Sequence, residues 1–76
     1  MQFLIEYDRD DGKIVSIRHY SDSDRSRAEV DRLKLELELR RLGKEHEVVV
    51  LEANSEAALR KTHRRYFEDL AELVRG

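Results

Sequence analysis

Residues 33–42 read Leu33-Lys34-Leu35-Glu36-Leu37-Glu38-Leu39-Arg40-Arg41-Leu42, so that leucines alternate with charged residues. Such alternation is typical of a half-buried strand. Leu, Glu, Lys and Arg nevertheless all have high helix propensity, and the preceding residues 21–24 (Ser-Asp-Ser-Asp) suit a helix N-terminus. Gly43 offers a left-handed stop. We therefore predict a helix over residues 23–42, with a strand over 33–42 as the less favoured alternative.

The apolar residues of this predicted helix fall on two opposite sides, because successive residues are turned by about 100°. Val30, Leu33 and Leu37 form one stripe. A helix that is apolar on two sides needs cover on both. We expect the first stripe to face the chain's own sheet and the second to face a partner. The second stripe consists of Ala28, Leu35, Leu39 and Leu42.

The composition indicates a single domain spanning all 76 residues, with 39% hydrophobic and 42% charged residues. A net charge of −2 provides no general attraction to nucleic acid or to anionic membranes. The absence of cysteine excludes disulfides, thiol catalysis and cysteine-ligated metals. No apolar run approaches the ~18 residues of a membrane span, and no signal-peptide pattern opens the chain. We expect a cytoplasmic protein without a membrane partner, and the excess of Arg over Lys suggests a bacterial source.

Two alternating stretches near the start of the chain predict a β-hairpin, with strands over residues 2–7 and 14–20. The Asp-Gly pair between them favours a tight turn, with Gly12 at positive φ. A three-residue loop over 10–12 would place most of the large apolar side chains of both strands on the same face of the hairpin. The expected pairs are Tyr7 with Val15, Ile5 with Ile17, and Phe3 with His19.

Two further elements complete the predicted order ββαβα. A run of β-branched residues predicts a strand over 47–53, and Asn54 or Ser55 can cap a helix over 55–74. A right-handed crossover leaves the third strand parallel to the second. We predict a two-layer α+β domain in which a three-stranded mixed sheet of order 2-1-3 carries both helices on one face.

This arrangement leaves apolar side chains without cover, and these form the predicted homodimer interface. Cover of the second leucine stripe by the C-terminal helix is the competing explanation. The predicted interface residues are Leu35, Leu39 and Leu42 on the helix and Leu4, Ile14 and Tyr20 on the sheet.

A basic cluster in the last predicted helix offers a second possible site. Arg60, Lys61, Arg64 and Arg65 lie on its polar side and resemble a nucleic-acid patch in composition. The same cations can also be explained as a solvent-exposed side of the helix. In that case they form ion pairs with acidic residues one helical turn further along the chain. Because the chain as a whole is acidic, we favour the second explanation and expect no nucleic-acid partner.

The histidines do not suggest a metal site, because no two of them have the three- or four-residue spacing of helical ligands. His19, His63 and Tyr66 could instead meet at one end of the sheet and form a small polar site. No serine lies in a nucleophile-elbow context, and neither a glycine-rich phosphate loop nor a calcium loop is recognisable. The leading hypothesis is therefore a non-enzymatic, homodimeric interaction module without a cofactor, and an unknown second protein is the alternative partner. The alternatives are a nucleic-acid-associated regulator and an enzyme acting through His19, His63 and Tyr66.

Overall fold

The computed structural model describes residues 1–67. Its elements follow in the order β1 (Gln2–Asp8), β2 (Lys13–Tyr20), the 3-10 turn η1 (Asp22–Asp24), α1 (Arg25–Leu42), β3 (His46–Glu52), α2 (Glu56–Thr62) and α3 (Arg64–Phe67). The predicted strands and first helix agree with these bounds to within two residues. The predicted continuous helix over 55–74 is wrong, because the chain breaks at His63 between α2 and α3. The end of that prediction, 68–74, lies outside the described residues.

The sheet has the predicted strand order β2-β1-β3, but it is antiparallel throughout rather than mixed. The crossover through α1 does leave β3 running in the same direction as β2. Since β1 lies between these two strands and runs against both, no neighbouring pair is parallel. The prediction of a mixed sheet is therefore corrected by the central position of β1.

The β1–β2 register is as predicted in the middle of the hairpin and differs near its turn. Phe3 pairs with His19 and Ile5 with Ile17, but Tyr7 pairs with Ile14 instead of Val15. The loop spans residues 9–12 and is closed by the N–H of Gly12, which donates to the Asp8 carbonyl at 2.8 Å, with Gly12 at the expected positive φ of 67°. The change of register is a β-bulge in β2, and it directs Ile14 toward the core.

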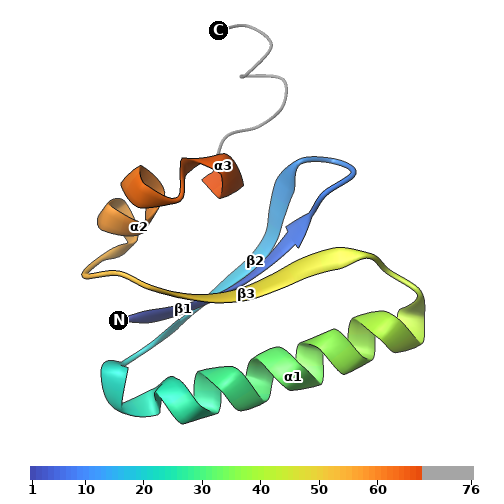
Figure 1. The fold of residues 1–76 in the computed structure, drawn as a ribbon, viewed down its shortest axis with the longest axis horizontal. Helices are drawn as coiled ribbons and strands as arrows, with labels where there is room; N and C mark the ends of the chain where they lie inside the picture. The colour runs from blue at the N-terminus through green and yellow to red at the C-terminus, as the bar shows by residue number, and fades with distance from the viewer. Residues whose placement is uncertain (68–76) are drawn as a thin grey trace, which may run out of the picture.

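Helices cover both faces of the sheet, so the predicted placement of both helices on one face is wrong. In Figure 1, α1 lies on one side of the sheet, and α2 and α3 lie on the other. Phe3 and Ile5 are buried with Leu59 of α2, while Leu4 points to the opposite face and is equally buried. Because β1 is apolar on both faces, a single helical layer would have left Leu4 in water.

The ends of the helices follow local chemistry. Gly43 ends α1 at a φ of 70°, and the N–H of Lys44 donates to the Leu39 carbonyl at 2.9 Å. The Ser55 hydroxyl caps α2 by accepting from the N–H of Ala58 at 3.1 Å, as one of the two predicted caps. Among the described residues, no helix combines the length and apolar character needed to cross a membrane.

Candidate interaction surface

The two apolar sides of α1 have different surroundings. Ala28 and Leu39 face the sheet and are 0% and 6% exposed. Val30, Leu33 and Leu37 lie on the other side and are 52%, 54% and 56% exposed. We call these three residues the outer stripe. It lies opposite Leu39, because a separation of nine positions, at about 100° each, turns the helix by two full turns and a half-turn.

The sequence prediction had these two sides reversed. It directed Leu33 and Leu37 to the sheet, whereas the structure directs Leu39 and Ala28 there, with Leu35 partly buried. One polar contact orients the helix: the Tyr20 hydroxyl of β2 donates to the Asp31 carboxylate at 2.7 Å. Because Asp31 precedes Leu35 by four residues, this contact brings the Leu35 side of α1 toward the sheet.

Five of the six predicted interface residues are buried or partly buried within the chain itself. Leu4 is covered by α1, Ile14 packs against the core around Phe3 and Ile5, and Tyr20 is held by Asp31. Leu39 is buried against the sheet, whereas Leu35, like Ile14 and Tyr20, is only partly buried. Leu42 alone is exposed, at 51%, and it lies about 120° around the helix from Val30.

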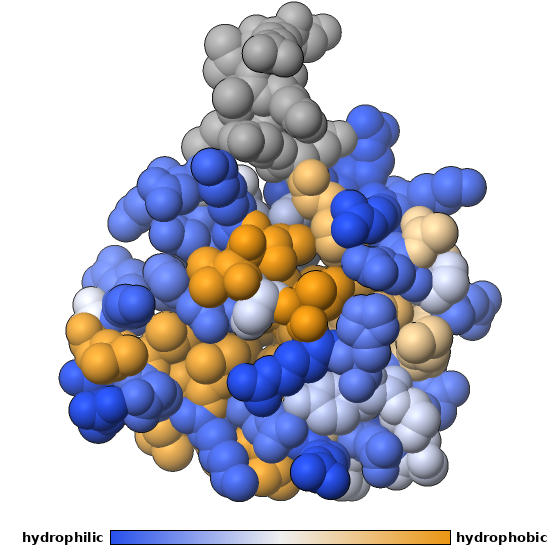
Figure 2. Space-filling model, turned by 180° about the vertical axis from the view of Figure 1, so that it is seen from behind, coloured by the Kyte–Doolittle hydropathy of each residue, from blue (hydrophilic) through white to orange (hydrophobic). Residues whose placement is uncertain are grey.

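The competing explanation, cover by the C-terminal helix, is not supported by the described part of that segment. Helices α2 and α3 lie across the sheet from α1 (Figure 1). In the space-filling view, apolar residues also reach the surface in the lower part of the molecule, where α1 lies, between charged residues (Figure 2). Over residues 1–67, each residue of the outer stripe therefore remains more than half exposed.

A groove of about 440 Å³ lies between the C-terminal end of α1 and the first residues of β3. Leu39, Arg40, His46 and Val48 are among its lining residues. The His46 ring is already in contact with carboxylates of β1, with Nδ1 2.5 Å from Glu6 and Nε2 3.6 Å from Asp8. Residues 1–67 contain no cluster of three or more side chains suited to hold a metal ion. The groove therefore has no ready-made set of metal ligands among the described residues.

The four predicted nucleic-acid contacts do not share one side of one helix, because the break at His63 separates Arg60 and Lys61 from Arg64 and Arg65. Arg60 donates to Glu56 at 3.1 Å and stacks over the ring of Phe67. These cations are thus distributed over two short helices.

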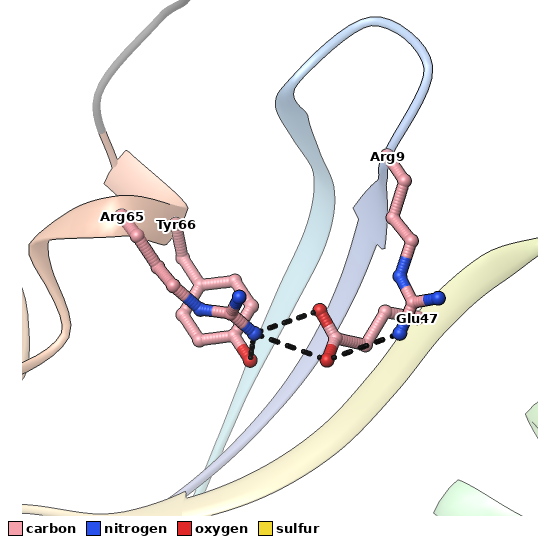
Figure 3. Close-up of polar contacts among 4 residues, drawn as sticks. All are labelled: Arg9, Glu47, Arg65 and Tyr66. Atoms are coloured by element: carbon pink, nitrogen blue, oxygen red, sulfur yellow. Dashed lines mark hydrogen bonds and ion pairs between the residues drawn. The ribbon is translucent and has the colours of Figure 1, made fainter.

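Arg65 contacts two neighbouring side chains, Glu47 and Tyr66, as Figure 3 shows. Its guanidinium donates to both Glu47 carboxylate oxygens, at 3.1 and 3.2 Å, and to the Tyr66 hydroxyl at 2.6 Å. Glu47 also pairs with Arg9 of the hairpin loop at 3.5 Å. This group of contacts attaches α3 to β3 and to the β1–β2 turn, which is a structural use of Arg65.

The predicted polar site is not assembled. His19 packs edge-on against Phe3 with ring centroids 5.0 Å apart, whereas Tyr66 packs edge-on against Tyr7 at 5.1 Å. Phe3 and Tyr7 are four residues apart on β1, or about 13 Å along the strand. His63 lies at the junction of α2 and α3, where its N–H donates to the Leu59 carbonyl. The expectation that His19, His63 and Tyr66 meet is therefore wrong.

Comparison with protein families, with curated proteins and with solved structures gives no match for this chain. Its function has to be argued from its own surfaces, and the outer stripe of α1 is the most distinctive of them.

Proposed function

We propose that this chain is a non-enzymatic interaction module of the cytoplasm that forms a homodimer through the outer stripe of α1. The observation that carries the proposal is the exposure of Val30, Leu33 and Leu37, each more than half accessible, in one continuous stripe. Contiguous apolar patches on small proteins usually mark contacts with other molecules. Full burial of a leucine or valine contributes roughly 1.5–3 kcal/mol relative to full exposure, and about half of this remains to be gained at each position.

The size of the chain supports a second copy as a source of stability. A single domain of 76 residues has a small core, whose fully buried large side chains are Phe3, Leu4, Ile5 and Leu59. Dimerisation adds apolar burial that the monomer cannot supply. A helix face is also a rigid platform, which reduces the conformational entropy lost on association.

Sedimentation equilibrium over a wide concentration range tests this proposal. We expect a concentration-dependent species of twice the 9.0 kDa chain mass. Leu33→Glu should yield a folded monomer, because it places a charge in the centre of the stripe. Leu42→Glu is the matched control, since Leu42 is exposed to a similar degree but lies off the stripe, and it should leave the dimer intact. The proposal would be refuted if the protein showed a 9.0 kDa species alone, even at near-millimolar concentration.

A further inference from the structure

The outer stripe has the spacing of a coiled-coil seam. Val30 and Leu37 are seven residues apart, with Leu33 between them, which matches positions a, d and a of a heptad. In this register the polar residues Ser26 and Arg40 occupy the neighbouring d positions. The apolar seam is thus three layers long and lies in the middle of α1.

The same register explains why α1 is apolar on a second side. Ala28 and Leu35 fall at position f and Leu39 at position c, which point away from a coiled-coil seam. These are the residues that contact the sheet or lie near it. The two apolar sides therefore serve two different contacts and do not compete. Helix α1 is also the outermost layer on its side of the sheet (Figure 1), so a second helix can approach along its whole length.

The residues beside the seam are sorted by charge. Every e position of α1 is basic, and both g positions within the helix are acidic. Residues at e and g flank the seam in a coiled coil, and their charges determine partner and orientation. The e positions are Arg27, Lys34 and Arg41, and the g positions are Glu29 and Glu36.

This sorting distinguishes the two possible orientations of a pair of identical helices. In a parallel pair, each g residue faces the e residue five positions later in the partner, so that Glu29 meets Lys34 and Glu36 meets Arg41. In an antiparallel pair, e residues face e residues and g residues face g residues, which would bring cation against cation and carboxylate against carboxylate. The charges of α1 thus attract in the parallel arrangement and repel in the antiparallel one.

The contacts within one chain leave Lys34 available to a partner and leave acceptor positions on Glu29 and Glu36. Arg32, on the inner side, donates to Glu29 at 2.9 Å and to Glu36 at 2.8 Å. A carboxylate has about four acceptor positions, so each can hold Arg32 and a partner's cation together. Lys34 has no acidic partner in the described part of its own chain, while Arg41 pairs with the exposed Glu38.

We propose that two copies of this chain pair their α1 helices in parallel, as a short two-stranded coiled coil with Val30, Leu33 and Leu37 at its seam. This inference rests on the proposed homodimer and adds its orientation. The two-fold axis runs along the helices, and the two sheets lie on the outside of the dimer. Since the apolar seam is short, the dimer dissociates at micromolar concentrations.

Cysteine cross-linking tests the orientation, because the chain has no cysteine of its own. Ser26→Cys and Arg40→Cys place single thiols at d positions on either side of Leu33. A parallel pair brings identical positions together, so each variant alone should form a disulfide-linked dimer under a mild oxidant such as diamide. An antiparallel pair centred on Leu33 would bring position 26 against position 40, so only a mixture of the two variants would cross-link. The variants differ in mass, so mass spectrometry separates all three products.

Lys61→Cys is the control for random collision, since Lys61 is exposed on α2, away from α1. Self-linked products well above this control support the parallel pair. A dimer that yields only the mixed product overturns the parallel orientation and leaves the proposed function intact. A dimer with no product above the control overturns the pairing through α1 altogether. A protein that stays monomeric in sedimentation refutes the proposed function itself.

A charge-exchange series provides independent evidence. Lys34→Glu should weaken the dimer about tenfold, because it converts two attractive contacts with Glu29 of the partner into repulsive ones. Adding Glu29→Lys to the same chain should restore most of the loss, and Lys61→Glu should leave dimerisation unchanged. A double variant as weak as the single variant would overturn the parallel pairing. Thermal unfolding of each variant at low concentration separates these effects from loss of the fold.

Discussion

The two sides of α1 are made of the same kinds of residue and meet different environments. The inner side, with Ala28 and Leu39, is buried against the sheet, whereas the outer stripe is more than half exposed. Periodicity alone predicts that both sides need cover and does not say which side the chain covers itself. The difference shows that the orientation of an amphipathic helix depends on contacts at specific positions, here the packing of Ala28 and Leu39 and the hydrogen bond from Tyr20 to Asp31.

The largest expected difference between the two sides concerns leucine truncation. Leu39→Ala should lower the free energy of unfolding by about 2–4 kcal/mol, because it removes buried methyl groups and leaves a cavity. Leu37→Ala should change it by less than ~0.5 kcal/mol in a dilute, monomeric sample, because Leu37 is mostly exposed there. Urea unfolding followed by circular dichroism measures both. Equal losses at the two positions would show that the outer stripe is also covered within the monomer.

Enlarging a side chain sharpens the same comparison. Ala28 has no exposed surface, so Ala28→Leu should destabilise the fold by about 1–3 kcal/mol through overpacking against the sheet. Val30→Leu adds volume on the outer side, where there is room, and should leave monomer stability unchanged. Thermal unfolding of the two variants at equal concentration makes the test. If Ala28→Leu leaves the stability of the fold unchanged, α1 can move away from the sheet without loss of stability.

The polar contact that orients α1 is expected to have a smaller effect. Tyr20→Phe removes the hydroxyl that donates to Asp31 at 2.7 Å and should cost about 1 kcal/mol. Asp31→Asn retains an acceptor and should cost less. If Tyr20→Phe leaves unfolding unaltered, packing of Ala28 and Leu39 alone determines which side of the helix faces the sheet.

Alkaline pH should weaken the hydrogen bond between Tyr20 and Asp31 and lower the stability of the fold. Burial raises the pKa of the Tyr20 hydroxyl above its usual 10.0, and the hydrogen bond to Asp31 raises this pKa further. Above pH 10 the unfolded chain therefore loses this proton before the folded chain does, and stability falls as the pH rises through the pKa of the folded state. Unfolding curves between pH 9 and 11.5 should show a shallower decline for Tyr20→Phe than for the unmodified protein. Parallel declines would exclude Tyr20 as the titrating group.

Much of the fold could be predicted because it depends on local chemistry. The positive φ of Gly12 and Gly43, the Ser55 cap and the alternation in β1 and β2 each involve residues close together in the sequence. The strand register near the hairpin turn could not be predicted, because a bulge at Val15 allows Ile14 to join the core. The gain in burial for Ile14 depends on residues of α2 and α3 that are more than forty positions away.

The sequence indicated that one apolar side of α1 would be exposed, but the prediction chose the wrong side, because Val30, Leu33 and Leu37 are the exposed residues. The regular charges at Arg27, Lys34 and Arg41 repeat every seven residues beside Val30 and Leu37, and this pattern was a signal for the outer stripe. The continuous apolar run Phe3-Leu4-Ile5 was a signal that β1 is buried on both faces and needs helices on both.

By itself, the sequence determined the three strands, the first helix and the two-sided character of α1, because propensity, capping and periodicity act within a few residues. Only the tertiary structure decided which side of α1 faces inward and which face of the sheet each helix covers. These choices depend on the fit between surfaces that are distant in the chain, such as Leu4 against α1 and Ile5 against Leu59. Such fit is a property of three-dimensional packing, which no local pattern specifies.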